Sequence, residues 1–327
     1  MKPNLFDIAT KELSQDAFFT WLFLWGNPDC EIYNNELHKC SQEFIKKLLL
    51  KQFKINISIT KIEAGRQWNN IDIWVKINNE YLIVIEDKIS TFEHSNQLEN
   101  YKKFASDWCA KNNFKLLLFY LKTGTEFSGF LDKISQKNYF IIDRTELIDF
   151  FKTYSNIKND IFQDYYNRLI IIDDLEKTYE SLIIKDWSFN SWIGFYKYLE
   201  SHIDVSGWKY VPNPSGGFIG FWWHFLNWKD CKVYLQIEQG NLCFKIEASK
   251  NRAMIRNEFF SIIMKNAKLK NFIEIKKPKR FGNGIWMTVA IVDRNNWLGS
   301  DNYLINKNTV ISNLKKYEIF LDDCIKN

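Results

Sequence analysis

The segment NIDIWVKINNEYLIVIEDKIS, residues 70–90, holds the most informative pattern in the sequence. Two runs rich in Ile and Val, residues 70–77 and 81–90, flank the short polar segment Asn78-Asn79-Glu80. β-branched and aromatic residues favour strands, and a polar break of this length is typical of a β-hairpin. We therefore expect two antiparallel strands joined by a three-residue loop.

The length of this loop determines which side chains share a face of the hairpin. A three-residue loop places Ile77 opposite Tyr81 and therefore Asp72 opposite Glu86. Opposed side chains of antiparallel strands share a face, with Cβ atoms about 4.5–5.5 Å apart. Lys88 lies on the same face as Glu86 because side chains alternate along a strand. A loop one residue shorter or longer would put the two carboxylates on opposite faces.

Two carboxylates and one ammonium on one patch suit a divalent metal ion and the hydrolysis of a phosphodiester. Converging carboxylates bind hard cations, of which Mg²⁺ is the usual case. Such an ion lowers the pKa of a bound water, and an ammonium beside it can neutralise charge on the phosphate. Solvated charges at a strand end are the alternative interpretation. However, Asp72 and Glu86 interrupt apolar runs, and a buried carboxylate needs a partner or a metal.

The segments around the hairpin predict a mixed α/β domain. Helical spacing or nearly continuous apolar character predicts helices at residues 12–25, 41–52 and 95–110. Besides the two strands of the hairpin, short apolar runs predict strands at residues 54–63, 115–121 and 138–143. The expected order of the core is helix, three strands, helix and strand.

The second part of the chain is predicted to be a smaller α+β domain. We expect a boundary near residues 180–205, which gives a first domain of residues 1–180 and a second of residues 181–327. Residues 245–280 hold eleven basic and three acidic residues. Such charge asymmetry is frequent in proteins that bind polyanions. The aromatic-rich, basic second domain is therefore predicted to recognise a target or a partner protein.

The acidic pair and the lysine resemble the signature of the PD-(D/E)XK nuclease superfamily, an Asp followed after a variable gap by Glu/Asp-x-Lys. Asp72, Glu86 and Lys88 match this signature, Asp87 is the variable residue, and Ile71 replaces the proline. The expected element order also resembles the restriction-endonuclease-like core of that superfamily. The apolar first helix and the VIEDKI strand resemble those of an uncharacterised bacterial branch.

This resemblance implies a metal-dependent nuclease that hydrolyses phosphodiester bonds of nucleic acid, with DNA the preferred substrate over RNA. Asp72 and Glu86 would bind Mg²⁺ or Mn²⁺ with help from the backbone carbonyl of Asp87, and Lys88 would assist the hydrolytic water. The alternative is a catalytically silent nucleic-acid-binding or sensor protein that keeps the nuclease scaffold. A homodimer or a partner protein also fits this resemblance.

Further site residues are expected on the two helices that flank the strands. The resemblance implies a metal-directed glutamate on the first helix, for which Glu12 is the first choice and Asp16 the competitor. The alternative for Glu12 is a helix-start acid favoured by the helix dipole. Gln97 and Tyr101 match a Gln-x-x-x-Tyr pattern of some branches and lie on one helical face. An ordinary amphipathic helix is the alternative.

Two further groups of polar residues are candidates for contact with nucleic acid. His94 follows Lys88 closely, although a surface loop readily accommodates a histidine. Basic residues of the second domain are the expected phosphate contacts, and a solvated loop of lysines is the alternative. These residues are Lys250, Arg252, Arg256, Lys276, Lys277, Lys279 and Arg280.

Composition excludes several other classes of protein. The chain has 327 residues, 46% of them hydrophobic, and a net charge of +5, which excludes wholesale disorder. It contains no basic-then-apolar leader and no apolar run of the roughly 18 residues that a membrane span needs. The six cysteines form no CxxC pair, which favours a reducing compartment. We therefore expect a cytoplasmic protein without a membrane partner.

Overall fold

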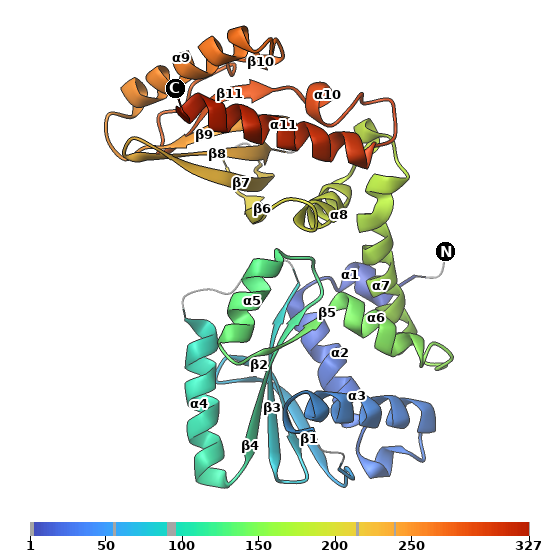
Figure 1. Cartoon of the computed structure of the whole chain (residues 1–327). Helices are drawn as coiled ribbons and strands as arrows, with labels where there is room; N and C mark the ends of the chain where they lie inside the picture. Colours follow the sequence, from blue (N-terminus) through green and yellow to red (C-terminus); the bar gives the residue numbers. More distant parts are fainter. Residues whose placement is uncertain (1–2, 55–56, 90–95, 214–215, 239, 327) are drawn as a thin grey trace. The chain divides into compact units, whose positions relative to one another are not determined.

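The computed structural model describes residues 3–54, 57–89, 96–213, 216–238 and 240–326 (Figure 1). The chain divides into two compact units, Met1–Asp173 and Asp174–Asn327. The division falls within helix α7 (Asp160–Lys177), somewhat before the boundary expected from composition. Each unit contains one β-sheet, so the chain is a mixed α/β protein.

The first unit is a five-stranded mixed sheet between two layers of helices. The sheet has the order β1-β2-β3-β4-β5, in which β1 to β3 are antiparallel and β3 to β5 are parallel. Its strands are β1 (Ile62–Trp68), β2 (Ile71–Ile77), β3 (Tyr81–Lys88), β4 (Lys115–Lys122) and β5 (Phe140–Asp143). Its helices besides α7 are α1 (Leu5–Ile8), α2 (Glu12–Leu24), α3 (Asn35–Phe53), α4 (Gln97–Asn112), α5 (Ser128–Gln136) and α6 (Arg144–Lys152).

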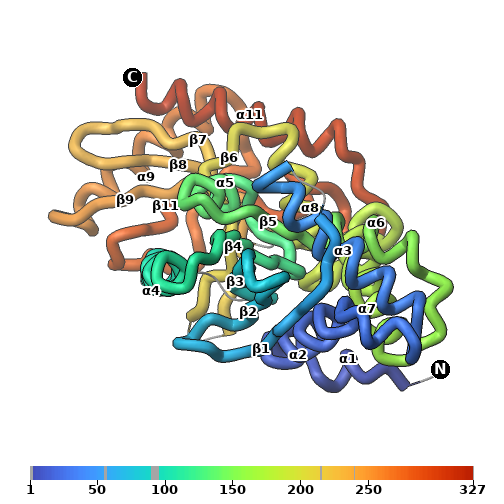
Figure 2. The backbone as a smooth tube through the Cα atoms, turned by 90° about the horizontal axis from the view of Figure 1, so that it is seen from below, coloured from blue at the N-terminus to red at the C-terminus, as the bar shows by residue number. Residues whose placement is uncertain are grey.

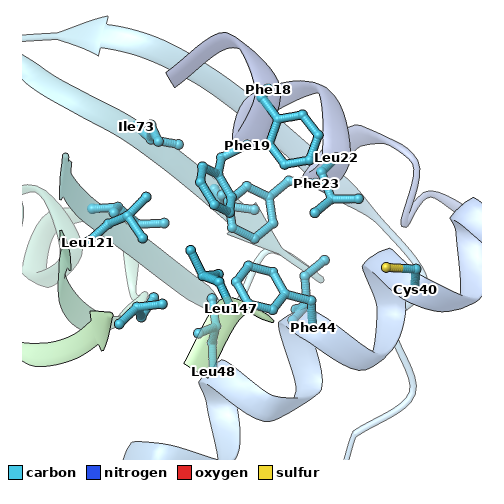
Figure 3. Packing of buried hydrophobic residues seen from close by; sticks show 14 of the residues in the cluster. Phe18, Phe19, Leu22, Phe23, Cys40, Phe44, Leu48, Ile73, Leu121 and Leu147 are labelled. Carbon is cyan, nitrogen blue, oxygen red and sulfur yellow. The ribbon is translucent and has the colours of Figure 1, made fainter. Parts of the chain in front are cut away.

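The two faces of this sheet carry separate hydrophobic cores. One face packs against α2, α3, α6 and α7, where aromatic rings such as those of Phe19 and Phe44 fill the space above Ile73 and Leu121 (Figure 3). The other face packs against α4 and α5 through residues such as Leu98. A view turned by 90° also shows α4 apart from α2 and α3 (Figure 2). The strand β3 is buried on both faces, so any charged side chain on it needs a partner.

The hairpin of β2 and β3 has the register that its three-residue loop predicts. Ile77 lies opposite Tyr81, and Ile73 lies opposite Ile85. Asn78 and Asn79 have φ values of 52° and 53°, a left-handed conformation that asparagine tolerates better than most residues. The side-chain oxygen of Asn78 also accepts the backbone N–H of Thr60 at 2.8 Å. The turn is therefore held in one conformation, and it sets the register.

The prediction of the first strand at residues 54–63 is wrong in its position. The strand β1 begins at Ile62 and continues through AGRQW, a segment with little intrinsic strand preference. Its pairing with β2 depends on Gly65, because a Cβ atom there would lie 2.6 Å from the indole of Trp74. Residues 55 and 56 of the predicted run lie outside the described residues.

The second unit contains a six-stranded antiparallel sheet with the order β10-β11-β9-β8-β7-β6. Its strands are β6 (Val205–Val211), β7 (Phe218–Trp228), β8 (Cys231–Glu238), β9 (Asn241–Glu247), β10 (Ile275–Lys276) and β11 (Trp286–Val292). Its helices are α8 (Phe189–Glu200), α9 (Arg252–Leu269), α10 (Arg294–Trp297) and α11 (Lys307–Lys326). Ring contacts join this sheet to its helices, as between Phe244 on β9 and Phe320 on α11. Within the described ranges, no helix is both long and apolar enough to span a lipid bilayer.

Candidate active site

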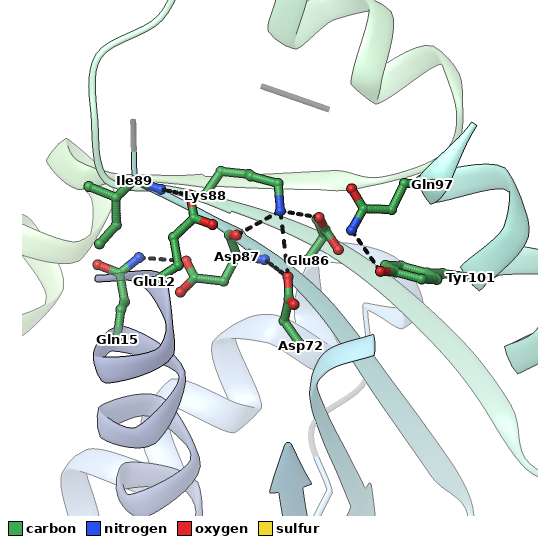
Figure 4. Close-up of polar contacts among 9 residues, drawn as sticks. All are labelled: Glu12, Gln15, Asp72, Glu86, Asp87, Lys88, Ile89, Gln97 and Tyr101. Atoms are coloured by element: carbon green, nitrogen blue, oxygen red, sulfur yellow. Dashed lines mark hydrogen bonds and ion pairs between the residues drawn. The ribbon is translucent and has the colours of Figure 1, made fainter. Parts of the chain in front are cut away.

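Three charged side chains meet where β2 begins and β3 ends (Figure 4). The ammonium of Lys88 forms an ion pair with Glu86 and lies 3.7 Å from Oδ2 of Asp72. Glu86 is fully buried, and Lys88 is 6% exposed. The two acids and the lysine thus share one patch of the sheet, as the hairpin register predicts.

The backbone of Asp87 belongs to the same cluster. Its N–H donates a hydrogen bond to Oδ2 of Asp72 at 2.9 Å and so joins the two strands beyond their last paired residues. Its carbonyl oxygen accepts a hydrogen bond from Nζ of Lys88 at 3.1 Å. One cation, the Lys88 ammonium, is therefore surrounded by the Asp72 carboxylate, the Glu86 carboxylate and the Asp87 carbonyl. The three oxygen groups therefore converge on one positive charge.

The electrostatics of the cluster favour an additional positive charge. Burial, reinforced by the negative charge of Asp72, raises the pKa of Glu86 to about 8. Burial opposes the charged form of Lys88, but the carboxylates of Glu86 and Asp72 outweigh it and raise the pKa of its ammonium. Apart from the ion pair with Lys88, neither carboxylate oxygen of Glu86 has a hydrogen-bond donor among the described residues. Below about pH 8 the protonated Glu86 leaves the cluster neutral, and a further cation beside it would favour the ionised carboxylate.

This donor set fits a magnesium ion better than a metal that requires a complete protein cage. Among the described residues, no three His, Cys, Asp or Glu side chains lie close enough to hold a metal ion by themselves. Mg²⁺ usually keeps several waters and binds proteins through one or two carboxylates. Two carboxylates and a backbone carbonyl supply ligands of that kind.

The raised pKa of Glu86 predicts how pH affects the metal-free protein. The folded state holds the Glu86 proton up to about pH 8, whereas the unfolded chain releases it near the ordinary value of 4.5. The free energy of unfolding should therefore fall as pH rises between these two values. Glu86→Gln should remove this slope and raise the melting temperature at pH 9 by on the order of 5 °C. Thermal denaturation in EDTA from pH 5 to 9 measures the effect.

The control for this experiment is Glu63→Gln on β1. The Glu63 side chain is partly exposed, and its hydrogen-bonded ion pair with Lys61 lowers its pKa. Its substitution should leave the pH dependence of the melting temperature between pH 5 and 9 unchanged. Parallel curves for wild type and Glu86→Gln would show that Glu86 is ionised throughout this range.

The helix α2 brings Glu12 to the backbone directly after β3 and Asp16 to the carboxyl group of Asp87. Oε1 of Glu12 accepts a hydrogen bond from the backbone N–H of Ile89 at 3.1 Å (Figure 4). Asp16 is buried one turn later and faces the carboxyl group of Asp87 on the opposite side of β3 from Lys88. Burial is the main cause that raises the pKa of Asp16 to about 6.

Gln97 and Tyr101 contact each other on the first turns of α4. Nε2 of Gln97 donates a hydrogen bond to the Tyr101 hydroxyl at 2.6 Å, and the pair lies on the Glu86 side of the cluster (Figure 4). Burial raises the pKa of Tyr101, which therefore stays protonated at neutral pH. His94 lies outside the described residues.

The basic residues of the second unit differ in what they contact. The buried guanidinium of Arg256 donates to the Gly282 carbonyl at 2.7 Å and lies over the ring of Phe281, so this side chain supports a loop. Lys276 forms an ion pair with Asp293, and Arg252 donates to the carbonyl of Ser249 at 3.3 Å. Exposed residues that stay predicted phosphate contacts are Lys250, Lys277, Lys279 and Arg280.

Two buried polar residues near the site were missed from sequence. Lys122 pairs in register with Lys88 on the neighbouring strand and lies 3.4 Å from a carboxylate oxygen of Glu126. The one indication of Lys122 in the sequence is that a lysine ends the wholly apolar run of β4. Gln15 on α2 contacts Asp87, and a glutamine among the polar residues at the start of that helix does not reveal its partner.

The first unit thus combines a mixed sheet, flanked by helices on both faces, with two acids and a lysine at the ends of adjacent strands. Residues 3–177 match the family model of the PD-(D/E)XK nuclease superfamily. The match covers more than half of the chain, and the protein belongs to this superfamily. Comparison with curated proteins and with solved structures gave no significant match.

Proposed function

We propose that this protein is a nuclease that uses Mg²⁺ or Mn²⁺ to hydrolyse phosphodiester bonds of DNA. The observation that supports the proposal best is the set of three oxygen groups around one cation position. Asp72, Glu86 and the Asp87 carbonyl all contact the Lys88 ammonium. Membership of a superfamily that generally comprises phosphodiester-cleaving nucleases supports the same activity.

In the proposed mechanism, Asp72, Glu86 and the Asp87 carbonyl would hold the metal ion. A bound ion of this kind lowers the pKa of a ligated water and stabilises charge on the departing oxygen. The Lys88 ammonium would orient the attacking water or neutralise negative charge on the phosphate. Glu12 fixes the backbone directly after Lys88 through its hydrogen bond to Ile89, and its negative charge acts on the Lys88 ammonium.

The rest of the chain suggests how the substrate is bound and where the protein acts. We infer that the exposed basic residues of the second unit contact backbone phosphates, which carry most of the affinity of proteins for nucleic acid. All six cysteines are free, and five of them are buried. Free thiols of this kind suit the reducing bacterial cytoplasm.

The proposal is tested by incubating the purified full chain with single- and double-stranded DNA and RNA. Reactions contain Mg²⁺, Mn²⁺ or EDTA. We expect cleavage of DNA with either metal, weaker cleavage of RNA, and none with EDTA. Calorimetric titration with Mg²⁺, on wild type and on Glu86→Gln, accompanies the assay. Metal binding without cleavage of any substrate would indicate a silent scaffold, and the absence of both would overturn the proposal.

A further inference from the structure

The side chain of Asp87 points away from the cation position and towards α2. Side chains alternate along a strand, so Asp87 faces the opposite side of β3 from Glu86 and Lys88. Its carboxyl group is fully buried. Oδ1 of Asp87 accepts a hydrogen bond from Nε2 of Gln15 at 2.5 Å (Figure 4). Gln15 therefore holds the side chain of a residue whose backbone carbonyl is one of the three cation-facing oxygens.

The orientation of the Gln15 amide follows from its other contacts. Its oxygen accepts hydrogen bonds from the hydroxyls of Thr123 and Tyr165, both at 2.9 Å. An amide oxygen accepts only, so both hydroxyls must donate and the amide nitrogen must face Asp87. All four side chains are buried. A buried network of this kind is rigid because each broken contact leaves a polar group without a partner.

The same helix holds β3 at a second point. Glu12 lies one turn before Gln15 and accepts the backbone N–H of Ile89. The helix α2 thus contacts Asp87 within β3 and Ile89 directly after it, one residue on either side of Lys88. In addition, the N–H of Thr123 donates to the Lys88 carbonyl at 3.2 Å. The peptide between Asp87 and Lys88 is fixed from several directions at once.

We propose that Gln15 is a positioning residue of the active site, which holds the Asp87 side chain and thereby aims the Asp87 carbonyl at the metal position. This inference rests on the function proposed above. Gln15 touches neither the cation position nor the Lys88 ammonium, and it acts only through Asp87. Asp16 also faces the Asp87 carboxyl group, so without the Gln15 amide that carboxyl group would turn towards Asp16 and move its own peptide. A displacement of about 1 Å at a catalytic group can cost about a hundredfold in rate.

The test compares Gln15→Met with Tyr165→Phe in the full chain. Methionine fills the volume of glutamine but removes the donor to Asp87 and both acceptor contacts. Tyr165→Phe removes one donor to the same amide and leaves the contact between Gln15 and Asp87 intact. We expect Gln15→Met to lower kcat about a hundredfold with little change in KM, and to weaken Mg²⁺ binding in calorimetry at least about tenfold. Tyr165→Phe should lower the melting temperature, and it should reduce kcat and Mg²⁺ affinity far less than Gln15→Met does.

Each outcome of this test bears on a different claim. If Gln15→Met has the same kcat and Mg²⁺ affinity as Tyr165→Phe, then Gln15 is not a positioning residue. The proposed nuclease activity would be unaffected by that result. A wild-type chain without Mg²⁺ binding or cleavage would overturn both. Should Gln15→Met fail to fold, Gln15→Asn keeps an amide that is too short to reach both Asp87 and the two hydroxyls. It should show the same loss of Mg²⁺ affinity.

Discussion

Lys88→Met is expected to lower the rate of metal-dependent DNA cleavage at least about a thousandfold while the chain stays folded. Methionine keeps most of the apolar stem of lysine and removes the ammonium. In the metal-free protein this leaves Asp72 and Glu86 without their shared cation. Glu86 already holds a proton below its raised pKa of about 8, so only the Asp72 carboxylate loses a charged partner. Single-turnover cleavage at saturating Mg²⁺ measures the rate.

The same substitution should tighten Mg²⁺ binding. The Lys88 ammonium contacts all three oxygen groups that we assign to the metal, so the lysine and the ion compete for them. Calorimetric titration should therefore give a lower Kd for Lys88→Met than for wild type. Lys76→Met is the matched control, because Lys76 lies on β2, outside the cluster, and near Glu63. If Lys88→Met cleaves DNA at the same rate as this control, then Lys88 has no role in the mechanism.

Asp72→Asn is expected to abolish both Mg²⁺ binding and cleavage, with a rate loss of at least about a thousandfold. The amide oxygen of asparagine can still accept the backbone N–H of Asp87, which Asp72 accepts at 2.9 Å. The melting temperature in EDTA should therefore stay at or above that of wild type. Asp72→Ala loses the charge and the hydrogen bond together, and it should melt earlier.

Asp107→Asn on α4 serves as the control for this pair of variants. Asp107 is exposed, and its substitution should change neither the rate nor the Mg²⁺ affinity. An Asp72→Asn chain that binds Mg²⁺ as wild type does would exclude this carboxylate as a ligand. Cleavage without Mg²⁺ binding would exclude the metal from the reaction.

The hairpin and its acids were predictable from sequence because they depend on local features. Apolar runs define β2 and β3, and a loop of three residues leaves one arrangement of faces, so Asp72, Glu86 and Lys88 could be brought together without coordinates. The strand β1 was not predictable in the same way. Its residues pair with β2 because Trp74 packs over Gly65, and this packing depends on the partner strand rather than on residue preference.

The residues around the acids depend on contacts between distant segments. Helical spacing places Glu12 and Asp16 one turn apart, and only the end of β3 determines which of them meets the backbone of Ile89. Gln15 contacts Asp87, which is 72 residues away in the sequence. Arg256 looked like a phosphate contact, but the loop at Phe281 covers its guanidinium. Sequence spacing carries no information on such pairs.

The turn at Asn78 and Asn79 has a consequence for genetics. It sets the register of the hairpin, yet it lies at the far end of both strands from Asp72 and Glu86. Inserting or deleting one codon there would place Asp72 and Glu86 on opposite faces of the sheet, although both strands would still form. A screen for null alleles should therefore recover in-frame insertions and deletions in this turn, although its residues take no part in the reaction.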